Sequence, residues 1–128
     1  MSDRPEWPSE EIPDSDQLFM RVHEMWRRGE SVSPGAFQNH NGAMSVDWER
    51  YAEPYETRRR AQAPEKNAVV SLRVGKVRSV PGQVVQHTPD IDRKNRAHTD
   101  VAGDKDEEVR IQLRRCAGVV IAFDAPAD

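Results

Sequence analysis

Apolar residues gather in three stretches of the chain, at about residues 17–26, 68–85 and 109–123, with polar segments between them. The middle stretch has the clearest pattern, because it contains three short runs rich in valine that are separated by Gly75 and by Pro81-Gly82. β-Branched residues favour strands, and Gly and Pro-Gly mark turns. The pattern therefore predicts a small antiparallel meander over residues 68–87, with strands at about 68–74, 76–80 and 83–87.

The first apolar stretch fits two interpretations. A helix over residues 14–28 would place five apolar side chains on one face, namely Leu18, Phe19, Val22, Met25 and Trp26. A strand would instead send alternate residues to opposite faces, with Arg21 and His23 on the face that Phe19 occupies. The helix accounts for more of the residues and is the favoured interpretation, while the strand stays open.

Weaker signals place the other elements. Residues 44–48 alternate as a short strand, and a helix over about 54–62 has Pro54 at its first position, where proline is favoured. A short strand is predicted at 97–103. Asp104 or Asp106 can then cap a helix, and β-branching favours a last strand at 118–123.

These elements predict a single α+β domain over residues 14–128, with an antiparallel sheet of four to six strands packed against two or three helices. Residues 1–13 are acidic and contain three prolines, so a flexible tail without helix is expected there.

Charge and cysteine content narrow the functional classes. The net charge is −3 with both signs mixed, and the run Arg58–Arg60 has acidic neighbours that favour surface ion pairs, so nucleic-acid binding is not expected. Cys116 is the only cysteine, which excludes an intrachain disulfide and a cysteine-based zinc site. No signal-peptide pattern and no apolar run of about 20 residues is present. We therefore expect a cytoplasmic protein without membrane contact.

No glycine-rich phosphate motif and no G-x-S-x-G motif occurs in the sequence. The candidate catalytic residues are instead a set of single polar positions: Arg21, His23, Glu56, His98 and Asp100. His98 and Asp100 share one face of a predicted strand, where a carboxylate could orient an imidazole for base catalysis. Arg21 would hold a phosphate, and Glu56 or His98 would act as base or polariser. No metal and no cofactor are predicted from the motifs.

The segments LFMRVH, SVSPGAF, MSVDW and AVVSLRVGKVRSV follow one another in an order that is similar to that of a group of small bacterial proteins. Residues 17–80 also resemble, more distantly, the early part of RES-type domains, which are toxins related in fold to ADP-ribosyltransferases and act on NAD. In this resemblance Arg21 matches the arginine of the first strand, Ser45 the middle polar position and Glu56 the later glutamate. The resemblance implies a strand over residues 17–23 and a nucleotide ligand held by Arg21 and Ser45.

Two functional classes follow. The first is a bacterial accessory or interaction protein with a protein partner, for example in a toxin or defence system. The second is a small enzyme that binds a nucleotide or NAD. The first is favoured, since each isolated polar residue also has a structural explanation. Convergence of the candidate residues on one cleft would favour the second.

Overall fold

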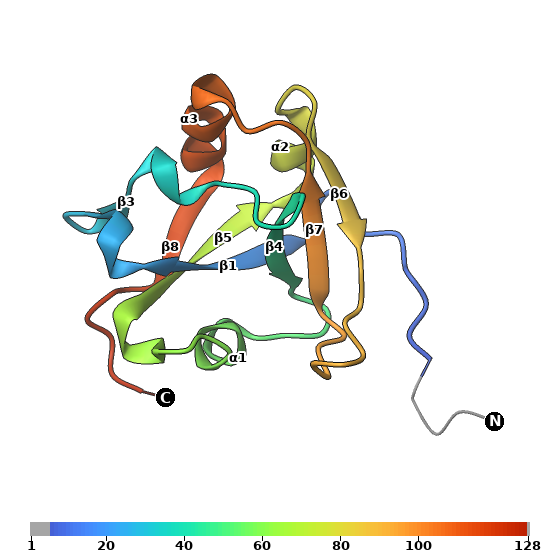
Figure 1. Ribbon diagram of the computed structural model, residues 1–128, viewed down its shortest axis with the longest axis horizontal. Coiled ribbons are helices and arrows are strands. Elements are labelled where there is room, and N and C mark those ends of the chain that lie inside the picture. Colours follow the sequence, from blue (N-terminus) through green and yellow to red (C-terminus); the bar gives the residue numbers. More distant parts are fainter. Residues whose placement is uncertain (1–5, 128) are drawn as a thin grey trace.

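The structure of the protein, a computed structural model, describes residues 6–127 (Figure 1). Its centre is an antiparallel sheet of six strands in the order β6-β7-β4-β1-β5-β8. The strands are β1 (Gln17–His23), β4 (Ala43–Trp48), β5 (Asn67–Arg73), β6 (Val84–His87), β7 (His98–Ala102) and β8 (Ala117–Ile121). A small hairpin joins β2 (Arg27–Arg28) and β3 (Ser31–Val32). The helices are α1 (Pro54–Arg59), α2 (Val74–Ser79) and α3 (Glu107–Cys116), with single 3-10 turns at Glu24–Trp26, Pro34–Ala36 and Pro64–Lys66. The predicted α+β domain is confirmed.

The two faces of the sheet have different surroundings. Figure 1 shows α2 and α3 on one side of the sheet and α1 on the other. The main core lies on the α2 and α3 side, where alternate residues such as Leu18, Met44 and Leu72 are buried. On the other side, α1 covers a smaller cluster of Phe19, Val69 and Ile121. The rest of that side carries polar residues and holds the candidate site described below.

The meander predicted over residues 68–87 is wrong in its middle part. The predicted second strand falls largely in helix α2, and three strands separate β5 from β6 in the sheet. Val74 and Val77 are both fully buried, which one face of a helix achieves at a spacing of three residues. The first amides of this helix donate to backbone carbonyls of Asp16 and Asp14, and a Cβ at Gly75 would lie 3.0 Å from that of Asp14. Tertiary contacts therefore override the strand propensity of this valine-rich run.

The favoured helix over residues 14–28 is also wrong, and the strand alternative is correct. β1 lies in the interior of the sheet and pairs with β5 over seven residue pairs. Both of its faces are partly buried, because Phe19 packs under α1 while Leu18 and Met20 enter the main core. Apolar residues on both faces of a strand imitate the spacing of an amphipathic helix, which explains the misassignment.

The remaining elements agree with the predictions within a few residues. Glu53 and Glu56 form a capping box at the start of α1, which ends earlier than predicted. The side chain of Asp106 caps α3 by accepting from the Val109 amide at 2.9 Å. The last strand, β8, begins directly after α3.

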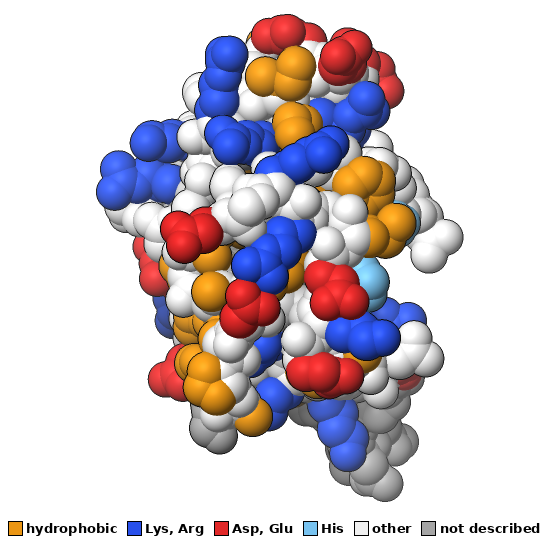
Figure 2. All heavy atoms as spheres, turned by 90° about the vertical axis from the view of Figure 1, so that its left-hand side faces the viewer, with side chains coloured by type: hydrophobic (Ala, Val, Ile, Leu, Met, Phe, Trp, Pro, Cys, Tyr) orange, Lys and Arg blue, Asp and Glu red, His pale blue; other side chains and the backbone are white. Residues whose placement is uncertain are grey.

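Basic and acidic side chains are intermingled with small hydrophobic groups on the face that Figure 2 shows. This agrees with the mixed charge pattern of the sequence. Within residues 6–127, no helix has the length and apolar character that crossing a membrane requires.

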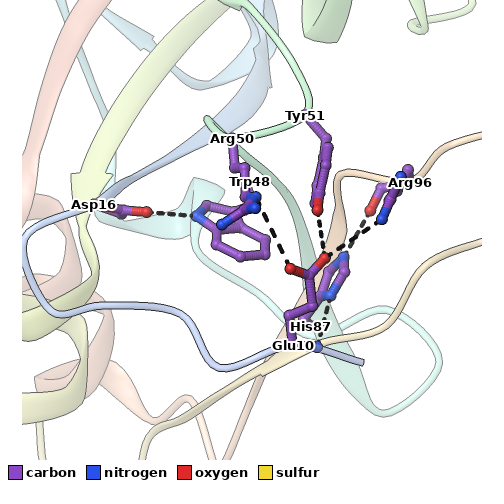
Figure 3. Close-up of polar contacts among 7 residues, drawn as sticks. All are labelled: Glu10, Asp16, Trp48, Arg50, Tyr51, His87 and Arg96. Atoms are coloured by element: carbon purple, nitrogen blue, oxygen red, sulfur yellow. Dashed lines mark hydrogen bonds and ion pairs between the residues drawn. The ribbon is translucent and has the colours of Figure 1, made fainter. Parts of the chain in front are cut away.

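In the N-terminal segment, Ser9 and Glu10 contact His87 at the end of β6, and residues 1–5 of the predicted tail lie outside the described part. The Glu10 amide donates to His87 Nδ1 at 3.1 Å, and His87 Nε2 lies 2.7 Å from the Arg96 carbonyl oxygen (Figure 3). The Glu10 carboxylate accepts from the Tyr51 hydroxyl, and this bond lowers the pKa of Glu10. The flexibility expected for residues 1–13 stays a prediction.

The assignment of faces predicts unequal costs for two truncations. Leu72→Ala should lower the free energy of unfolding by about 2–5 kcal/mol, because it opens a cavity in the main core. Val84→Ala, at a side chain that is 58% exposed, should change it by less than about 0.5 kcal/mol. Urea unfolding followed by circular dichroism measures both, and similar losses for the two variants would contradict the assignment.

Candidate functional site

A pocket of about 370 Å³ opens on the polar side of the sheet. Strands β1, β4 and β7, helix α1 and the loop between β6 and β7 all contribute to it. Charged and polar side chains form much of its lining: Arg21, Ser45, Asp47, Arg60, Arg93 and His98. The pocket therefore brings together residues that lie far apart in the sequence.

The pairing of the strands explains where the pocket opens. β1 and β4 form only two residue pairs, Leu18 with Trp48 and Phe19 with Asp47. Beyond these pairs, Arg21 on β1 and Ser45 on β4 line the pocket instead of continuing the ladder. Helix α1 is short and packs on β1, β5 and β8, so it leaves this part of the sheet uncovered.

Asp47 forms the floor of the pocket and is 4% exposed. One carboxylate oxygen accepts from the Thr57 hydroxyl at 2.7 Å, and the other accepts from the Asn95 side-chain amide at 2.8 Å. The side-chain oxygen of Asn95 in turn accepts from the Ala97 amide at 3.1 Å. One buried carboxylate therefore connects β4, α1 and the loop that leads into β7.

Three arginines surround this floor. Arg21 Nη1 donates to the Thr57 carbonyl oxygen at 3.2 Å. Burial lowers the pKa of Arg21, Asp47 opposes the shift, and the positive charges of Arg60 and Arg93 lower the pKa further. Arg93 also lies 3.8 Å from Asp90 at the rim. A guanidinium stays protonated after such a shift, so three positive charges meet at one pocket.

His98 lies on the β7 wall with a defined tautomer. Its Nδ1 is 2.9 Å from the carbonyl oxygen of Thr88, and a carbonyl only accepts, so this contact assigns the proton to Nδ1. The Thr88 hydroxyl lies 3.0 Å from the same nitrogen. The free nitrogen, Nε2, then accepts from the hydroxyl of Ser45 at 3.3 Å. Ser45 therefore faces the ring nitrogen of His98 that the Thr88 backbone leaves free.

Of the residues named from the sequence, the structure brings Arg21, Ser45 and His98 together in the pocket. His23 and Glu56 are used elsewhere, since His23 Nδ1 accepts from the Met25 amide and Glu56 belongs to the capping box of α1. Asp100 is paired across the sheet with Ser45 and Gln86, and it is not among the residues that line the pocket.

Sequence reasoning did not name several polar residues of the pocket as candidates, namely Asp47, Thr57, Arg60, Arg93 and Asn95. Alternation along residues 44–48 was a usable signal for Asp47, because it places this residue on the same face as Ser45. Arg60 was assigned to surface ion pairs with the rest of its run. Arg93 and Asn95 lie in the loop between β6 and β7. No local sequence pattern predicts which part of the fold such a loop contacts.

No protein-family model matches the chain, and neither a curated protein nor a solved structure matches it. Within residues 6–127, no group of three or more His, Cys, Asp or Glu side chains is placed to hold a metal ion.

The role of Asp47 predicts different costs for two substitutions. Asp47→Ala leaves the Thr57 hydroxyl and the Asn95 amide without their acceptor, so the free energy of unfolding should fall by about 2–3 kcal/mol. Asp47→Asn should cost less, because its oxygen can accept from Asn95 and its amide can donate to the Thr57 hydroxyl. Chemical denaturation measures both values, and equal losses would show that these hydrogen bonds do not set the stability of the floor.

Proposed function

We propose that the protein binds a small ligand with a phosphate group, such as a nucleotide, in this pocket. The convergence of Arg21, Arg60 and Arg93 carries the proposal. A guanidinium offers a planar fork of donors that matches the oxygens of a phosphate and stays charged at any physiological pH. The two oxygens of Asp47 are held by Thr57 and Asn95, so the arginines keep donors for a ligand.

The size and lining of the pocket support the same class of ligand. A volume of about 370 Å³ lies within the range of about 300–1,000 Å³ that is usual for small-molecule sites. Its lining holds three arginines against the two aspartates Asp47 and Asp90, and this balance of charge suits an anion. The resemblance to RES-type domains implies NAD, which also carries phosphate groups, and so agrees with this proposal.

The accessory or interaction role in the cytoplasm, with a protein partner, stays a second proposal. Its support is the edge strand β8, where Val119 and Val120 are 38% and 47% exposed. An uncovered edge can accept a further strand from a partner. Ligand binding is placed first, because an interaction role does not require three arginines to meet in one pocket.

Calorimetric titration with inorganic phosphate, AMP and NAD tests the proposed function. At least one of these ligands should bind at low salt and more weakly at high salt. Arg60→Gln should weaken this binding about tenfold or more, because a hydrogen bond to a charged group contributes about 1.5–3 kcal/mol.

Arg115→Gln is the matched control, since it removes the same charge from the exposed surface of α3. It should leave the affinity almost unchanged. The proposal fails if none of the three ligands binds, or if the two substitutions weaken binding equally.

A further inference from the structure

Ser45 and His98 form a serine–histidine pair in the candidate pocket. Ser45 is exposed on the polar side of the sheet, and its hydroxyl contacts Nε2 of His98 at 3.3 Å. The opposite nitrogen is held by the Thr88 carbonyl, which keeps the ring in one orientation and one tautomer. A nucleophile, a base and a group that orients the base are the three parts of an activated serine.

The other three histidines in the described residues are placed differently. Both nitrogens of His87 are occupied by backbone groups, the Glu10 amide and the Arg96 carbonyl, and the ring is 1% exposed. His23 accepts from a nearby backbone amide, and His40 pairs through its backbone with Ala43. Only His98 combines a free basic nitrogen with a side-chain hydroxyl inside a pocket.

We propose that Ser45 is a nucleophile that takes up the phosphoryl group of a phosphate monoester, with His98 as its general base. This inference rests on the proposed function, because the arginines must hold the phosphate. They match a group with three anionic oxygens, and they stabilise the negative charge on those oxygens during transfer. This charge requirement favours phosphoryl transfer over acyl transfer.

The reaction proceeds in two steps. Ser45 Oγ forms a bond to phosphorus on the side opposite the ester oxygen, and the bond from phosphorus to the ester oxygen breaks. The serine proton passes to His98 Nε2, and the departing alkoxide takes a proton from a solvent water and leaves a hydroxide. Water then forms a new bond to phosphorus, and the bond to Ser45 Oγ breaks. His98 returns its proton to Ser45 Oγ, and the proton of the attacking water passes to the hydroxide that the first step left in the solvent. The sum is phosphate monoester plus water giving alcohol plus inorganic phosphate, with both side chains restored.

The test uses p-nitrophenyl phosphate and AMP as substrates and inorganic phosphate as the binding probe. The full chain should release p-nitrophenolate or phosphate, and acid quenching during turnover should trap one added phosphoryl group on the peptide that contains Ser45. Ser45→Ala should abolish turnover and the mass gain but keep phosphate binding. His98→Gln should lower turnover about 10²–10⁴-fold.

Ser71→Ala is the matched control, because Ser71 lies on β5, on the same side of the sheet, but does not line the pocket. It should leave turnover and labelling unchanged. Phosphate binding without turnover or phosphoserine would overturn this inference and leave the proposed function standing. Turnover that survives in Ser45→Ala would also overturn it. Absence of phosphate, AMP and NAD binding would overturn both.

Discussion

The candidate site depends on the hydrogen bonds that hold the buried carboxylate of Asp47. A carboxylate in the protein interior is costly unless hydrogen bonds and nearby positive charge compensate for the lost water. Here the compensation comes from Thr57 on α1 and Asn95 in the loop before β7, with Arg21 close by. The carbonyl of Thr57 then holds Arg21, and Asn95 fixes the amide of Ala97, the residue directly before His98. The hydrogen bonds of the Asp47 carboxylate thus help to position both Arg21 and the strand that carries His98.

The main core and the candidate pocket lie on opposite faces of the sheet. Alternate residues of the same strands point into the main core or toward the pocket: Met20 lies in the core, and its neighbour Arg21 lines the pocket. The helices divide in the same way: α2 and α3 cover the core side, and the short α1 covers only part of the other side, over β1, β5 and β8. The pocket opens on the part of this side that α1 leaves uncovered.

Local signals predicted part of this structure well. The helix starts at Pro54 and Asp106 and the alternation over residues 44–48 are short-range chemistry, and the structure confirms all three. Residues 14–28 and 76–80 were misassigned, because their apolar patterns reflect burial that only the completed fold creates. The same limit applies to the site. Arg21, Ser45 and His98 could be named from strands and from a resemblance, whereas Arg93 and Asn95 depend on how a loop closes over Asp47.

The central claim is that Arg21, Arg60 and Arg93 act together as one anion site. Side-chain NMR of the arginine Nε–H groups during titration with inorganic phosphate tests it most directly. The account predicts that the signals of these three arginines shift together with a single dissociation constant, while Arg27 and Arg78, which pair with Asp124 and Asp14, stay unchanged. Shifts spread evenly over all the arginines, or confined to residues outside the pocket, would contradict it.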